Sequence, residues 1–167
     1  MRVAGYHQRA PILSFSHRVG TLLDLATEKV SESQVFLALQ EALHHQRCHV
    51  SVLIDYTTYP RITSSPPYYE IYLECNWEKV DVTSLAKQID ESLSKANAIY
   101  ARLRKGNMMI GPPVVNGLAP GSFEALTQAR EEEAPHIGRN QLKTPRVLRN
   151  DQWLAFLEER VVSRSEK

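Results

Sequence analysis

The strongest constraint on the fold is the spacing of apolar residues, which switches along the chain between the period of a helix and that of a strand. Apolar residues recur at intervals of four in some segments, as in Val35, Leu39 and Leu43, which predicts a helix. Other segments alternate apolar and polar residues, as strands do. The predicted elements are a strand at 21–25, a helix at 31–45, strands at 48–57 and 68–76, a helix at 81–103 that Gly106 ends, and a strand at 109–116.

This order, β-α-β-β-α-β, is typical of a ferredoxin-like body in the α/β (α+β) class. In such a body two helices cover one face of an antiparallel sheet. Residues 58–67 hold three prolines and predict a loop, and two further prolines within 109–116 predict an edge strand. We expect two short strands within 2–17, joined by a turn at Gln8-Arg9, and additional C-terminal helices at 121–132 and 151–160.

Composition excludes several classes of function. A net charge of +1 gives no basic field for nucleic acid. The apolar runs are too short to span a membrane, and the first residues have no signal-peptide core. Cys48 and Cys75 do not form a disulfide framework, so we expect buried thiols in a reducing, intracellular and cytoplasmic compartment.

Most catalytic motifs are absent from the sequence. It contains no phosphate-binding Gly-x-x-x-x-Gly-Lys loop, no Gly-x-Gly-x-x-Gly and no Gly-x-Ser-x-Gly. The adjacent His44 and His45 lack the spacing of a metal site. Glu70 and Glu74 share one face of a strand but are too far apart for a direct carboxylate pair. The residues therefore predict no self-sufficient active site.

One lysine is nevertheless well placed to contact an anion. Lys143 precedes Thr144-Pro145, and the proline removes a backbone donor and disfavours helix before it. A lysine in a stiffened loop is a point cation on a flexible stem, which suits a phosphate.

Six blocks of residues resemble the Gretchen Hagen family of auxin-responsive acyl-acid amido synthetases, in its C-terminal portion. The blocks are Val3-Ala4-Gly5-Tyr6-His7 with Pro11, Asp55-Tyr56-Thr57-Thr58-Tyr59, Tyr69 with Tyr72 and Glu74, Ile110-Gly111-Pro112, Gly121-Ser122-Phe123, and Gln141-Leu142-Lys143-Thr144-Pro145-Arg146. The final residues look most like the animal members.

The resemblance implies an adenylate-forming ligase that joins a small carboxylic acid to an amino acid or amine, with ATP and Mg²⁺ as cofactors. It implies that residues 1–18 are terminal strands and hinge of a large N-terminal adenylating domain. Residues 19–167 would then be the C-terminal lid domain, which is inactive by itself. Lys143 would be catalytic and contact the nucleotide phosphate, and Arg18 would lie at the hinge.

A second function stays open at this point. Gln8 stands where the family has Asn, and Leu142 where it has Tyr. The same body could therefore be a non-catalytic module for protein interaction or small-molecule sensing, since a fold does not determine a function. An animal member could also associate with the endoplasmic reticulum or nuclear envelope.

Overall fold

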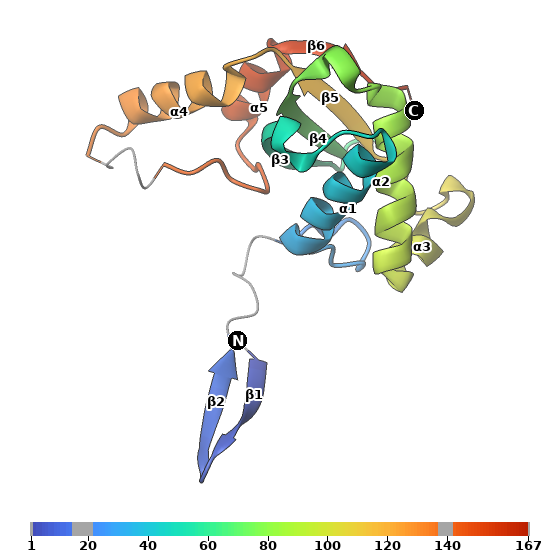
Figure 1. Ribbon diagram of the computed structural model, residues 1–167, viewed down its shortest axis with the longest axis vertical. Helices are drawn as coiled ribbons and strands as arrows, with labels where there is room; N and C mark the ends of the chain where they lie inside the picture. Colours follow the sequence, from blue (N-terminus) through green and yellow to red (C-terminus); the bar gives the residue numbers. More distant parts are fainter. Residues whose placement is uncertain (1, 15–21, 137–141, 167) are drawn as a thin grey trace.

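The computed structural model describes residues 2–14, 22–136 and 142–166 (Figure 1). An N-terminal hairpin pairs β1 (Arg2–His7) with antiparallel β2 (Ala10–Ser14). Gln8 has a positive φ of 54° at the turn, which confirms the predicted hairpin over the described residues. Across the described part of the chain, no helix is long and apolar enough to cross a membrane.

A mixed four-stranded sheet forms the centre of the remaining chain. Its strands are β3 (Leu53–Arg61), β4 (Tyr68–Cys75), β5 (Val114–Leu118) and β6 (Val161–Arg164), in that spatial order. β4 pairs antiparallel with β3 and parallel with β5, and β6 pairs antiparallel with β5. The predicted α/β class is confirmed, but the sheet is not wholly antiparallel.

The first predicted strand, at 21–25, is wrong. Over its described residues only Leu23 pairs, in a single bridge with Val30. Between them the carboxylate of Glu28 accepts from the backbone N–H groups of Leu25 and Ala26, at 2.8 Å each, which stabilises a loop. The fourth strand is β6, which the sequence did not predict because Val161–Arg164 is short.

Prolines misled two further predictions. Residues 58–61 belong to β3 and not to a loop. The backbone N–H and C=O of Thr58 point away from β4, to the outer edge of the sheet. Residues two apart in a strand point the same way, so Pro60 also faces that edge, and its missing N–H removes no hydrogen bond to β4. Pro112 and Pro113 lie before β5 and not within it. β5 is an internal strand and not an edge, because it pairs with β4 on one side and β6 on the other.

Within the described residues, five α-helices accompany this sheet. They are α1 (Glu32–His45), α2 (Val82–Ala96), α3 (Ala98–Arg104), α4 (Ser122–Glu133) and α5 (Asp151–Glu158). Short 3-10 turns cover Val50–Val52, Trp77–Lys79 and Lys105–Asn107. The helix predicted at 81–103 is broken at Asn97, whose extended backbone ends α2 and whose side chain caps α3.

The helices cover both faces of the sheet. α1 and α2 lie side by side on one face (Figure 1) and share a core with Tyr69, Ile71 and Leu73 of β4. On the other face α4 and α5 pack around Tyr72. Every residue of β4 is buried, as expected for a strand covered on both sides.

Gly117 lies where β5, β6 and the Trp77 ring pack closely together. A Cβ on Gly117 would lie 2.2 Å from Ser163 Oγ and 2.8 Å from the Trp77 ring. We expect Gly117→Ala to lower the free energy of unfolding by about 1–3 kcal/mol through overpacking, measured as a lower urea midpoint. Gly5→Ala, whose Cβ would meet nothing within 4 Å, is the control. An unchanged midpoint for Gly117→Ala would contradict this packing.

Candidate functional site

The segment that follows Lys143 closes the outer edge of β3. The Thr58 N–H donates to the Arg146 carbonyl at 3.0 Å, and the Leu148 N–H donates to the Thr58 carbonyl at 2.8 Å. These bonds form a parallel bridge between Thr58 and Val147. An open sheet edge presents unpaired backbone groups, and here the segment satisfies them. The backbone just after the predicted lysine is therefore fixed to the sheet.

Two buried threonine hydroxyls strengthen this attachment. Thr57 Oγ1 donates to the Pro145 carbonyl and Thr58 Oγ1 donates to the Arg146 carbonyl, each at 2.5 Å. Both threonines are almost fully buried. The hydroxyls therefore add two hydrogen bonds to the backbone contacts that hold residues 145 and 146 against β3.

Arg146 attaches the same segment to the start of β3. Its guanidinium pairs with Asp55, donates to the Tyr56 carbonyl at 2.7 Å, and lies 4.5 Å from the centre of the Tyr56 ring. Burial raises the pKa of Tyr56 to about 12, although the charge of Arg146 opposes part of that increase. Tyr56 is therefore a neutral packing residue near pH 7 and not a proton donor or acceptor.

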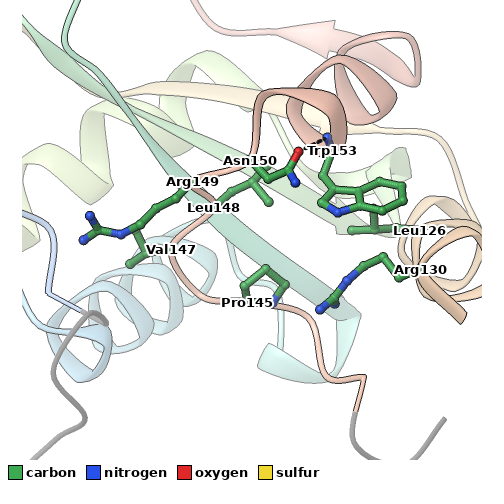
Figure 2. Close-up of a pocket in the computed structure, with 8 residues that line it drawn as sticks. All are labelled: Leu126, Arg130, Pro145, Val147, Leu148, Arg149, Asn150 and Trp153. Carbon is green, nitrogen blue, oxygen red and sulfur yellow. Dashed lines mark hydrogen bonds between the residues drawn. The ribbon is translucent and has the colours of Figure 1, made fainter. Parts of the chain in front are cut away.

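On the other side of Lys143 the backbone is held by α4. Arg130 reaches from α4 toward the loop of Pro145 (Figure 2), and its Nη1 donates to the Lys143 carbonyl at 2.9 Å. Leu142 is buried directly before it. The Lys143 side chain itself is exposed, and no carboxylate among the described residues pairs with it. The result is an outward-facing cation on a fixed backbone.

A buried carboxylate positions α4 itself. Glu74 of β4 accepts from the N–H groups of Gly121 and Phe123, at 2.5 and 2.9 Å. These groups lie at the N-terminus of α4, where the helix dipole favours negative charge. Gly121 has a φ of 81°, a conformation that glycine adopts at little cost. The central strand thus orients the helix that carries Arg130.

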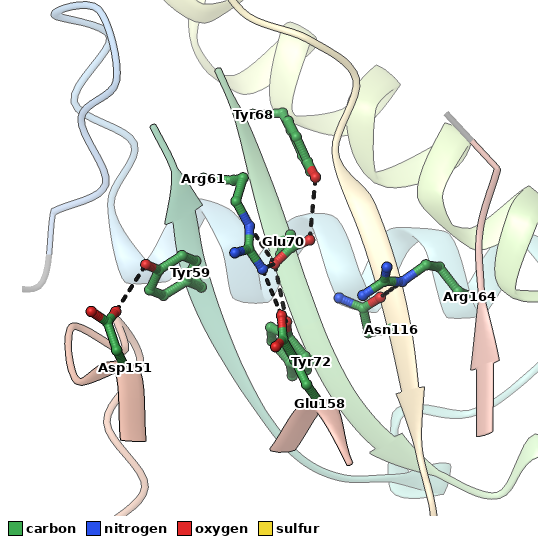
Figure 3. A network of polar contacts seen from close by, with 9 residues as sticks. All are labelled: Tyr59, Arg61, Tyr68, Glu70, Tyr72, Asn116, Asp151, Glu158 and Arg164. Carbon is green, nitrogen blue, oxygen red and sulfur yellow. Dashed lines mark hydrogen bonds and ion pairs between the residues drawn. The ribbon is translucent and has the colours of Figure 1, made fainter. Parts of the chain in front are cut away.

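Glu70, four residues before Glu74 in β4, has a different role (Figure 3). Its buried carboxylate accepts from Arg61 at 2.5 Å and from the hydroxyls of Tyr68 and Tyr72 at 3.3 and 3.0 Å. Arg61 also pairs with Glu158 of α5 at 2.7 Å. Burial raises the pKa of Tyr72, with the charge of Glu70 adding to the increase. This network joins α5 to the sheet and leaves Glu70 with several partners, so we assign it no catalytic role.

The structure tests the predicted site only in part. Lys143 is described, exposed and anchored, whereas Arg18 lies outside the described residues and its hinge role stays a prediction. Sequence reasoning noted Thr57, Thr58 and Glu74 within matching blocks but gave them no role, and it missed Arg130. The one sequence signal for Glu74 is that it and Glu70 are the charged residues of an otherwise aromatic and apolar strand. Its partners are backbone groups, which no motif marks. Among the described residues no cluster of three potential metal ligands occurs.

Comparison with known proteins identifies the family of this arrangement. The model of the GH3 family C-terminal domain matches residues 33–152. The chain belongs to the GH3 family.

Relatives of this GH3 domain are plant acid–amido synthetases. Indole-3-acetic acid-amido synthetase GH3.8 of Oryza sativa subsp. indica is 29% identical, over 98% of this chain and 27% of that protein. The 4-substituted benzoates-glutamate ligase GH3.12 of Arabidopsis thaliana is 26% identical, over 97% of this chain and 30% of that protein. A solved GH3.15 acyl acid amido synthetase matches with a TM-score of 0.78 and 28% identity, over 99% of this chain and 30% of that one. The chain thus spans less than a third of the length of these relatives.

The threonine attachment of the GH3 domain can be tested directly. The double change Thr57→Val and Thr58→Val keeps the shape of both side chains and removes two hydroxyl donors. We expect a loss of about 2 kcal/mol in the free energy of unfolding, because each lost hydrogen bond costs about 1 kcal/mol. Faster amide hydrogen exchange at Leu148 should accompany that loss. Thr63→Val, at an exposed position, should change neither quantity. Unaltered exchange at Leu148 in the double variant would refute the attachment.

Proposed function

We propose that this GH3 domain is the C-terminal lid of an ATP-dependent, adenylate-forming acid–amido synthetase, and that Lys143 is its catalytic cation. The activities of two relatives support the reaction class, since one is an indole-3-acetic acid-amido synthetase and the other a 4-substituted benzoates-glutamate ligase. A solved relative, AtGH3.15, is in complex with 2,4-DB. The proposed substrates are a small carboxylic acid and an amino acid or amine.

The anchored backbone of Lys143 is the observation that carries the proposal. Adenylation accumulates negative charge at the α-phosphorus, and a cation placed there lowers the barrier electrostatically. A lysine can provide such charge only if its backbone is held while its ammonium group stays accessible. The bonds from Arg130, Thr57 and Thr58 hold the backbone, and the side chain is exposed.

The two cofactors would be bound by different domains. ATP would contact the domain through Lys143, because an ammonium group suits a phosphate oxygen. Mg²⁺ takes oxygen ligands from carboxylates and substrate phosphates. We assign Mg²⁺ and the carboxylic acid to an N-terminal adenylating domain, because this chain spans less than a third of its relatives. Closure of the lid would bring Lys143 to the nucleotide. We place the protein in the cytoplasm.

Lys143→Ala in the full-length ligase should slow acid-dependent pyrophosphate release by about 10²-fold or more, since a lost electrostatic contact in a transition state costs that much. Lys143→Arg should retain part of the rate, because it keeps the charge. The assay is pyrophosphate release in the presence and absence of the acid.

Lys87→Ala removes an exposed lysine from α2 and is the matched control. Thermal unfolding of each variant separates loss of chemistry from loss of fold. A wild-type rate in the folded Lys143→Ala enzyme would reject the role of Lys143. AMP formation by residues 1–167 alone would reject the assignment of the nucleotide site to another domain.

A further inference from the structure

A hollow beside the Lys143 loop has the character of a binding site that the proposed function does not use. It measures about 350 Å³ and lies between α4, the start of α5 and the segment that closes β3 (Figure 2). Small-molecule sites are of similar size and combine apolar walls with a few polar groups. Its lining residues are Leu126, Arg130, Pro145, Val147, Leu148, Arg149, Asn150 and Trp153.

The polar groups of the hollow are almost entirely hydrogen-bond donors. Arg130 contributes a guanidinium, and among the described residues only its Nη1 is bonded, to the Lys143 carbonyl. The indole N–H of Trp153 and the amide nitrogen of Asn150 have no acceptor among the described residues. The side-chain oxygen of Asn150 is already occupied, since it accepts from the N–H groups of Gln152 and Trp153 at the start of α5. The described lining contains no aspartate or glutamate.

The walls favour a flat or apolar body over a bare inorganic ion. Leu126 and Leu148 line the hollow and are buried in the apolar cluster that α4 and α5 form around Tyr72. The Trp153 indole is held edge-to-face against Phe156, with ring centres 6.1 Å apart. The indole is therefore a fixed plane on which an aromatic group can stack.

The arginines of the hollow are not equivalent. In Figure 2 the guanidinium of Arg130 lies on the same side of the segment as the Trp153 ring, whereas that of Arg149 projects away from both. An anion bound against the indole would therefore meet Arg130 and not Arg149.

From this donor set we propose that the hollow binds a small organic carboxylate with a flat apolar body, its carboxylate on Arg130 and its body on Trp153. The carboxylate would take the guanidinium N–H groups that Arg130 does not use for Lys143. Bound ligand would thus contact the side chain that holds the Lys143 backbone. This site does not depend on the action of Lys143 at a phosphate.

Titration of the ¹⁵N-labelled chain with benzoate, followed by ¹H–¹⁵N NMR, tests the site. Benzoate should move the indole N–H signal of Trp153 and leave that of Trp77 in place. Benzamide has the same shape without the charge and should bind about tenfold more weakly, as expected for loss of a charge-assisted hydrogen bond. Equal binding of benzamide, or of inorganic phosphate, would overturn the proposal.

Matched variants assign the carboxylate to one arginine. Arg130→Met should weaken benzoate binding about tenfold, whereas Arg149→Met removes the same charge from the same lining and should change it by less than about twofold. Equal losses in both would overturn the assignment. If Arg130→Met loses the native amide spectrum, Arg130→Lys replaces it and should show an intermediate loss. Lys143→Ala should leave the affinity unchanged, so this result is independent of the test of Lys143.

Discussion

The outer edge of β3 determines much of this structure. A strand edge leaves N–H and C=O groups without partners, and some segment must satisfy them. Here that segment is 145–148, and it is continuous with Lys143. The same hydrogen bonds therefore satisfy the backbone groups of the β3 edge and fix the position of Lys143. Weakening one would disturb the other.

The second organising element is β4, which is buried along its whole length yet carries two glutamates. Burial of an unpaired carboxylate would be very costly, so each has several donors. Glu74 takes two backbone N–H groups at the start of α4, and Glu70 takes Arg61 and two tyrosine hydroxyls. The two carboxylates thus orient the two helices, α4 and α5, that border the Lys143 segment and the hollow beside it.

Sequence patterns predicted the elements with strong periodicity and failed where tertiary contacts decide. The capped helix α1, strand β4 and helix α4 follow from hydrophobic spacing and capping residues. Asn97 lies within an apolar stripe, so its break was hidden. The side chain that makes the break also caps α3 and donates to the Glu28 carbonyl. Lys143 was identified from its loop and from the family resemblance. Arg130 could not be, because no sequence pattern marks its contact with the Lys143 carbonyl, which depends on how α4 packs against the loop. The match to the GH3 C-terminal domain confirmed the family and left the role of Lys143 to experiment.

The position of β6 in the chain has a consequence for biosynthesis. β5 is internal only because β6 pairs with its outer side, and β6 follows both α4 and α5 in sequence. During translation the edge of β5 therefore stays open until Val161–Arg164 leaves the ribosome. Exposed strand edges recruit other chains, so the nascent domain is most prone to aggregation in that interval. Truncation just after α5 would prolong this state indefinitely.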